Sequence, residues 1–130
     1  MDESILRTSA GSGKNAVECI GIFAEKGIVL CVFGGEQPHI GAVALAIPRP
    51  SLKDQTKLSA TSSILTVVGH KEDELVKSLS EETARKLNLT TVVVAGLHVE
   101  KASGQNIKSL RENAIKATEE TVNKLVRRQK

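Results

Sequence analysis

The 130-residue sequence has no tryptophan and no tyrosine, and it contains only two phenylalanines, two cysteines and one methionine. Proteins that hold single-stranded nucleic acid stack its bases on aromatic side chains beside a basic groove. Aromatic residues are scarce here and the formal net charge is only +3, so nucleic acid is not expected as a partner. The cationic excess lies close to the C-terminus, where it suits the negative end of a helix dipole.

Long hydrophobic runs are also missing. An uncharged run such as residues 28–33 is far shorter than the roughly 20 residues that a membrane-spanning helix needs. The sequence starts with acidic and polar residues rather than with the basic and apolar regions of a secretory signal. We therefore expect a cytoplasmic protein that does not enter a membrane.

The motifs of common catalytic sites are absent as well. The sequence has no Gly-x-Ser-x-Gly nucleophile elbow, and the string GSGK at residues 11–14 lacks the spacing of a phosphate-binding loop. Cys19 and Cys31 lie within apolar, strand-like segments, which indicates buried thiols rather than nucleophiles or a disulfide. We expect a protein that is not an enzyme.

Hydrophobic residues make up 40% of the chain and charged residues 25%, as in an ordinary folded domain. Small and polar residues at 1–13 predict a flexible leader, and residues 14–130 predict a single α+β domain. Apolar segments rich in β-branched residues predict strands over 16–23, 28–33, 40–47, 58–68 and 90–99. Pro48 and Pro50 should end the third of these strands.

Helical periodicity predicts one helix over 71–87 and a second that begins after Ser103, a plausible N-cap. The resulting order β-β-β-β-α-β-α favours a mostly antiparallel sheet with both helices on one face. Several strands are apolar on both sides, so the other face of the sheet should be covered too. A second copy of the chain would cover it, and we expect a homo-oligomer, most simply a dimer.

All three histidines, His39, His70 and His98, fall at the ends of expected strands. Arg49 stands between two prolines, and the hydroxyl residues Ser51, Ser62 and Ser63 lie near it in the sequence. One hypothesis gathers these side chains into a polar pocket, in which arginine binds an anion and histidine exchanges protons. The other hypothesis treats them as unrelated loop and strand residues. A zinc site on three histidines is a weaker idea, because no His-x-His or His-x3-His pair is present.

Four blocks of sequence together resemble the family of prenylated-flavin chaperone-like domains, of the type of the small D subunit of gallate decarboxylase. They are PHIG at 38–41 with PRPS at 48–51, the serine pair at 62–63, VGHK at 68–71, and VAGLHVE at 94–100 followed by SGQNI at 103–107. The resemblance spans about residues 15–125. It implies a fold similar to the proteasome-assembly chaperones, whose members form dimers, and an accessory role for decarboxylases of aromatic acids.

The resemblance further implies that the protein binds prenylated flavin mononucleotide, or FMN, and delivers it to a large (UbiD-type) decarboxylase subunit. Arg49 with Ser51, Ser62 or Ser63 would then hold the phosphate, and His39, His70 and His98 would contact the polar edge of the ring system. Because the chain has neither Trp nor Tyr, the ring would rest on aliphatic or backbone surface. Two alternatives stay open: a subunit-docking module without ligand chemistry, and a small metalloprotein that uses the three histidines.

Overall fold

The computed structural model of the chain describes residues 4–67 and 72–128. In chain order the elements are β1 (Ile5–Ala10), a short 3-10 turn η1 (Gly13–Asn15), β2 (Val17–Ala24), β3 (Gly27–Gly35), β4 (Ala42–Pro50), β5 (Leu58–Thr66), α1 (Asp73–Leu87), β6 (Thr90–His98) and α2 (Gly104–Arg128). None of the described helices is long and apolar enough to cross a membrane.

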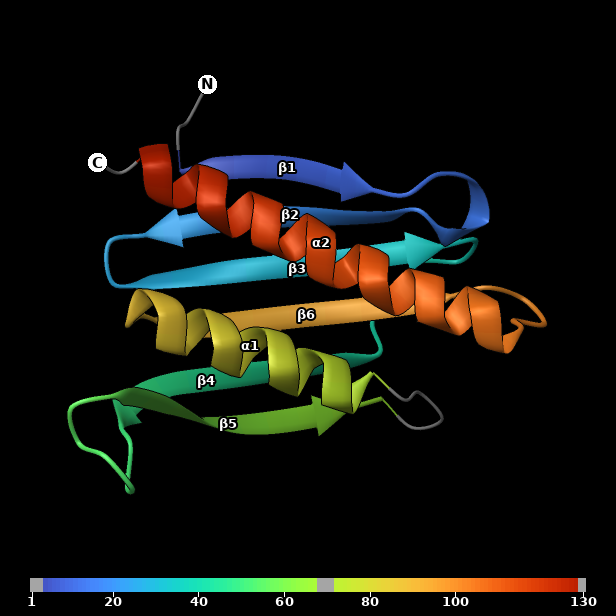
Figure 1. Cartoon of the computed structure of the whole chain (residues 1–130). Coiled ribbons are helices and arrows are strands. Elements are labelled where there is room, and N and C mark those ends of the chain that lie inside the picture. The colour runs from blue at the N-terminus through green and yellow to red at the C-terminus, as the bar shows by residue number, and fades with distance from the viewer. Residues whose placement is uncertain (1–3, 68–71, 129–130) are drawn as a thin grey trace.

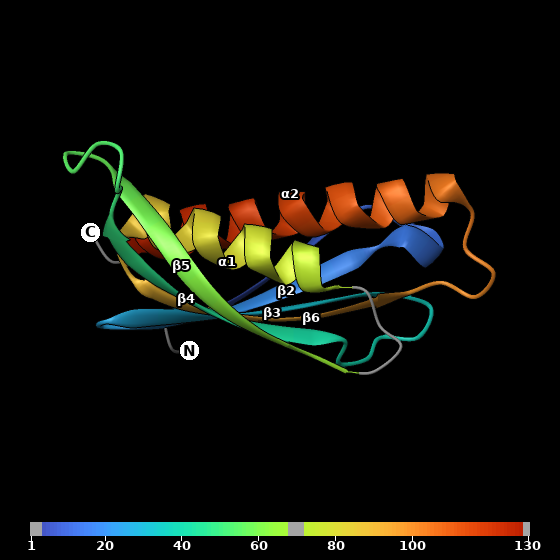
Figure 2. The ribbon, with the colours of Figure 1, turned by 90° about the horizontal axis from the view of Figure 1, so that it is seen from below.

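One six-stranded sheet forms the centre of the molecule, in the order β1-β2-β3-β6-β4-β5 (Figure 1). Only the β3–β6 pair is parallel, and the other pairs are antiparallel. Both helices lie on the same side of the sheet (Figure 2). The predicted fold class, α+β with two helices on one face of a mostly antiparallel sheet, is confirmed.

The hydrophobic core lies between the sheet and the helices. Strands β3, β4 and β6 alternate, so that residues such as Leu30, Ala44 and Val93 face the helices and are fully buried. From α2, Leu110 and Leu125 contribute buried leucines to the same cluster. Burying each large aliphatic side chain stabilises the fold by roughly 1.5–3 kcal/mol, which explains why the helices stay on this face.

The segment expected to be a flexible leader contains a strand, β1, which the predicted order of elements omits. It pairs antiparallel with β2 along its whole length. The sequence pattern does not predict this strand, because its buried positions are Thr8 and Ala10 rather than large hydrophobic residues. The Thr8 hydroxyl donates to the carbonyl of Ala117 at 2.9 Å, and its oxygen lies 2.6 Å from Thr121 Oγ1. These bonds satisfy the buried polar groups and fasten β1 to α2.

The prediction that Pro48 and Pro50 end the third strand is wrong, because β4 continues through both prolines and stays paired with β5. The backbone N–H of Ser51 donates to the carbonyl of Lys57 at 2.8 Å, which places the odd-numbered residues here toward β5. The prolines therefore direct their nitrogens to the other side. Pairing with β6 on that side stops at Ala46, so no ladder bond is lost.

The face of the sheet opposite the helices is apolar, and no described element lies over it (Figure 2). Alternation along the strands places half-buried side chains such as Val29 and Phe33 on this face, at its centre. More exposed hydrophobic residues surround them: Ile5, Ile22, Leu45, Ile47 and Leu65, with relative exposures of 41–77%. We refer to this surface as the open face.

Candidate functional site

A cavity of about 490 Å³ lies at the end of the molecule where both helices begin and β6 ends. It is lined by His39, Glu72, Leu75, Leu97, His98, Val99, Lys101, Ala102, Ile107, Leu110 and Arg111. Its walls combine aliphatic side chains with four ionisable residue types, and its size falls within the range of small-molecule sites.

Glycines allow the segment that carries His39 to cross the end of β6. Gly96 packs so closely under the carbonyl of His39 that a Cβ there would overlap it. Gly35 has φ 86°, a left-handed conformation that turns the chain out of β3 toward this crossing. The carbonyl of His98 then accepts the backbone N–H of Glu36 at 2.8 Å. The chain therefore brings two histidines 59 residues apart to one cavity.

The rings of His39 and His98 meet edge to face, with centroids 6.0 Å apart and an interplanar angle of 77°. His39 Nε2 lies 3.1 Å from Glu72 Oε1, and its Nδ1 lies 3.2 Å from the carbonyl of Gln37. His98 Nε2 lies 3.3 Å from Glu100 Oε2. A carboxylate thus orients each imidazole ring. The two oriented rings form part of the polar surface of the cavity.

Glu72 supplies the buried charge of the site. The residue is 9% exposed, and its Oε1 accepts the backbone N–H of Leu97 at 3.3 Å in addition to the contact with His39. Its Oε2 is buried and has no hydrogen-bond partner among the residues that the structure describes. Glu72 is also the N-cap residue of α1, where the helix dipole favours a negative charge. The carboxylate therefore links the start of α1 to the end of β6.

The mouth of the cavity is cationic. Lys101 and Arg111 line it and are exposed, and the first turn of α2 carries no acidic residue. The backbone N–H of Asn106 donates to Ser103 Oγ at 3.1 Å, so the N-cap predicted at Ser103 is present. Two exposed cations in the lining of one cavity suit an anion, because both contribute positive potential. The floor beneath is aliphatic, with Leu75, Leu97 and Leu110.

The structure brings together two of the seven residues predicted for the site, His39 and His98. Arg49 and Ser51 lie at the opposite end of β4, about 23 Å along the strand from Ala42 at roughly 3.3 Å per residue. There the Arg49 Nε–H donates to Thr61 Oγ1 at 2.6 Å, and Ser51 Oγ accepts the backbone N–H of Lys53 at 3.2 Å. Arg49 is therefore bonded to the neighbouring strand β5 and Ser51 to its own loop, both away from the cavity.

The remaining three predicted residues divide between two surfaces and the undescribed part of the chain. Ser62 Oγ donates to Glu81 Oε2 of α1 at 2.5 Å. Ser63 is exposed on the open face. His70 lies outside the described residues, two positions before Glu72 in the sequence. Among the described residues, no group of three or more histidine, cysteine, aspartate or glutamate side chains is placed to hold a metal ion.

Sequence reasoning missed Glu72, Lys101 and Arg111. Glu72 belongs to a run of three acidic residues that is typical of a solvated first helical turn, and only the tertiary structure shows that the first of them is buried. Lys101 follows the histidine block directly, so proximity to His98 was a usable signal. Arg111 had no such signal, because its position depends on how α2 crosses the end of β6.

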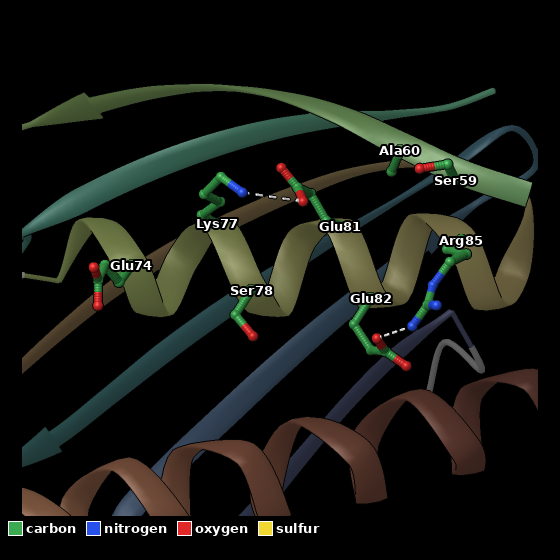
Figure 3. Close-up of a pocket in the computed structure, with 8 residues that line it drawn as sticks. All are labelled: Ser59, Ala60, Glu74, Lys77, Ser78, Glu81, Glu82 and Arg85. Carbon is green, nitrogen blue, oxygen red and sulfur yellow. Dashed lines mark hydrogen bonds and ion pairs between the residues drawn. The ribbon is translucent and has the colours of Figure 1, made fainter. Parts of the chain in front are cut away.

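A second cavity, of about 600 Å³, runs between α1 and β5 on the outer side of the molecule (Figure 3). Its lining is almost entirely polar and charged. On the helix, Lys77 forms an ion pair with Glu81 at 3.4 Å, and Arg85 pairs with Glu82. It shares no residue with the histidine cavity.

Comparison with known proteins gives one family and one fold. Residues 11–126 match the family model described as the prenylated flavin chaperone LpdD-like domain. No curated protein matches the chain. Among solved structures, a chain of a chaperone complex for yeast 20S proteasome assembly is similar, with a TM-score of 0.59, 12% sequence identity and coverage of 97% of each chain. At this identity the likeness concerns the fold alone.

Proposed function

We propose, from the premise that the chain belongs to the family of prenylated flavin chaperone LpdD-like domains, that it binds prenylated FMN reversibly in the histidine cavity. In this role it delivers the cofactor to a decarboxylase of aromatic acids, in the cytoplasm, and catalyses no reaction itself. The observation that carries the proposal is the combination of two histidines, two cations and an aliphatic floor in one cavity.

The residues present fit the chemistry of such a ligand. A prenylated flavin mononucleotide has an apolar ring extension, a polar ring edge and a phosphate. The apolar ring extension can contact the aliphatic side chains of Leu75, Leu97 and Leu110. Because the chain has no Trp or Tyr, the imidazole rings of His39 and His98 are the planar groups available for contact with the flavin ring.

Lys101 and Arg111 are the groups we assign to the phosphate. Guanidinium and ammonium groups form charge-assisted hydrogen bonds with phosphate oxygens. Arg49 and Ser51 serve the same chemistry in the sequence-based hypothesis, but they lie at the other end of β4 from the two histidines. The phosphate of a single FMN-type ligand in this cavity would therefore be bound by Lys101 and Arg111.

Both cations are exposed, and this favours exchange over permanent retention. Ion pairs in contact with solvent contribute about 0–1 kcal/mol, whereas buried ones are far harder to break. A carrier must release what it carries, so a phosphate held at the mouth and a ring held inside suit a transfer step. The undescribed residues 68–71 include His70, which the sequence hypothesis also assigns to the ligand.

Fluorescence titration with FMN and with prenylated FMN tests this assignment. Replacing Arg111 by alanine removes one solvent-exposed ion pair, so we expect the dissociation constant to rise by about two- to fivefold, and Lys101→Ala should behave in the same way. Arg49→Ala is the matched control, because it deletes the same charge at the far end of the sheet. If Arg49→Ala weakens binding and Arg111→Ala does not, the phosphate is not where we place it. If the unaltered protein takes up neither flavin, direct carriage is refuted.

We further propose that two copies of the chain associate through the open face. This face exposes Ile22, Leu45 and Ile47 together, and water-exposed apolar patches of this kind mark interaction surfaces. A two-fold dimer would bury the same strands of each copy against each other. The alternative function, a subunit-docking module without ligand, uses the same surface and predicts no response to flavin.

A further inference from the structure

Strand β5 forms one edge of the sheet, and no other described strand pairs with its outer side. The backbone bonds from Ser51 N–H to Lys57 O and from Val67 N–H to Gly41 O, both 2.8 Å, show which residues of this strand face β4. These are the odd-numbered ones. The residues that direct N–H and C=O groups to the free edge are therefore Leu58, Ala60, Ser62, Ile64 and Thr66.

This edge lacks the features by which proteins protect exposed strands. Leu58–Thr66 contains no charged residue and no proline, and its pairing with β4 runs without a bulge. The opposite edge, β1, differs. It carries Arg7, and the Arg128 guanidinium donates to the carbonyl of Ile5 at 3.3 Å. Of the two edges that the structure describes, β5 therefore presents the longer row of backbone donors and acceptors, along nine residues against six in β1.

The surfaces on either side of the β5 edge determine what could bind there. On the helix side lies the polar groove between β5 and α1, whose lining includes three carboxylates, Glu74, Glu81 and Glu82, and two cations. Lys77 and Glu81 lie on the side of α1 that faces β5, whereas the Glu82–Arg85 pair lies on the side that faces α2 (Figure 3). On the other side the open face reaches the edge through Leu65, which is 77% exposed. A strand added to β5 would project alternate side chains into these two surroundings.

We propose that the β5 edge accepts an extended, amphipathic segment of a partner polypeptide as a seventh strand of the sheet. The apolar side chains of this segment extend the open face beyond Leu65. Its polar side chains, with a basic excess, lie in the groove against α1, where the acidic side chains are in the majority. Backbone hydrogen bonds supply the affinity and the alternation supplies the specificity. The surface is separate from the histidine cavity, so the inference does not depend on flavin binding.

An acetylated nine-residue peptide that alternates valine with threonine and lysine is the probe. With the full-length protein, NMR-detected amide hydrogen exchange should slow at Ala60, Ser62 and Ile64 when the peptide is added. We expect no change at Thr61, whose N–H already faces β4. A peptide of the same composition with valines and polar residues in two blocks should give no protection, because it cannot match both surfaces.

Proline substitutions remove one edge donor at a time. Ala60→Pro should weaken peptide binding by about tenfold or more, since it deletes an N–H and places a ring where the new strand must approach. Thr66→Pro, at the end of the strand, is a second variant that disturbs the fold less. The matched control is Ser9→Pro. Because Phe23 N–H donates to Ser4 O, Ser9 points outward on the other edge, and binding should be unchanged.

Three results would overturn the proposal. The first is the absence of protection at β5 with any amount of the alternating peptide. The second is equal binding to the unaltered protein and to well-folded Ala60→Pro and Thr66→Pro variants. The third is protection without peptide that grows with protein concentration, which would make the occupant a second copy. An FMN titration on the same samples measures ligand binding in the histidine cavity separately. A negative result with the peptide at β5 therefore does not contradict the flavin proposal.

Discussion

At the scale of single residues, the two cysteines show how one sheet separates two environments. Cys19 is fully buried beneath α2, and this burial raises the pKa of its thiol from 9.0 to about 11. Cys31 pairs with Ile20 in the neighbouring strand and lies on the open face, where partial burial also raises its pKa. The thiols are on opposite faces, so they cannot form a disulfide with each other in the folded chain.

The Cys19 thiol should make stability depend on pH in the alkaline range. In the unfolded chain the thiol ionises near its ordinary pKa of 9.0, whereas in the folded protein it stays protonated to about pH 11. The protonated thiol therefore contributes fully to the free energy of unfolding below pH 9. As the pH rises toward 11, this free energy falls by about 2–3 kcal/mol in total. Urea unfolding at pH 8, 9 and 10 measures this loss.

Cys19→Ala is the comparison that isolates the effect, because other groups also titrate in this range. Between pH 8 and 10 the free energy of unfolding of the unaltered protein should fall further than that of Cys19→Ala, while Cys31→Ala should fall nearly as far as the unaltered protein. Parallel curves for the unaltered protein and Cys19→Ala would contradict the assigned cause.

At the scale of elements, the attachment of β1 to α2 rests on a buried pair of hydroxyls. Thr8 and Thr121 lie 2.6 Å apart, and Thr8 also donates to the Ala117 carbonyl. The two elements are separated by most of the chain in sequence, so this pair joins the first strand to the last helix. A buried hydroxyl that loses its partner is costly, because water cannot replace it.

Thr8→Val should therefore lower the free energy of unfolding by about 1–3 kcal/mol, although it keeps the shape of the side chain. The double variant Thr8→Val with Thr121→Val should cost less than the sum of the two single changes, because it removes both hydroxyls together. Ser9→Ala, at an exposed position in the same strand, is the control and should have little effect. Denaturant titration gives all four values, and strict additivity would rule out the coupling.

Elements also show where sequence reasoning succeeds and where it fails. Continuous apolar runs rich in β-branched residues, as in β3 and β6, predicted their strands, because such residues favour buried strands whatever their neighbours are. The strand β1 was missed because its buried positions hold Thr8 and Ala10. The extension of β4 through Pro48 and Pro50 depends on which neighbour strand ends first. Such information exists only in the topology.

The candidate site, too, could be predicted only in part from the sequence. The position of His39 and His98 at strand ends was visible in the sequence, and the crossing over Gly96 brings their rings together. Arg49 also lies at a strand end, but at the opposite end of the sheet. A sequence pattern reports that a residue follows a strand. It does not report toward which end of the sheet that strand points.

At the scale of the whole molecule, both helices cover one face of the sheet, and no described element covers the other. The proposed dimer makes Leu45 an interface residue; it is 41% exposed on β4, the strand next to the edge strand β5. Leu45→Lys should convert dimers into monomers, because two charges would have to be buried without partners. Sedimentation analysis over a range of protein concentrations measures the mass.

The control for this experiment is Leu52→Lys. Leu52 is 88% exposed in the connection between β4 and β5, outside the open face, so its replacement should leave the mass unchanged. A protein that sediments as a monomer at every concentration would remove the dimer from the proposal. The open face would then remain available to a different chain.

The parallel pairing of β3 with β6 has a consequence for how the molecule comes into being. Strands β3 and β4 follow each other in the chain but are not neighbours in the sheet, because β6 lies between them. The first 66 residues can build only two separate pieces, β1–β2–β3 and β4–β5. During synthesis on the ribosome these pieces must wait for β6 to join them. The histidine cavity needs Leu97, His98 and Arg111, so the cofactor binding that we propose requires β6 and the start of α2 to have emerged and docked first.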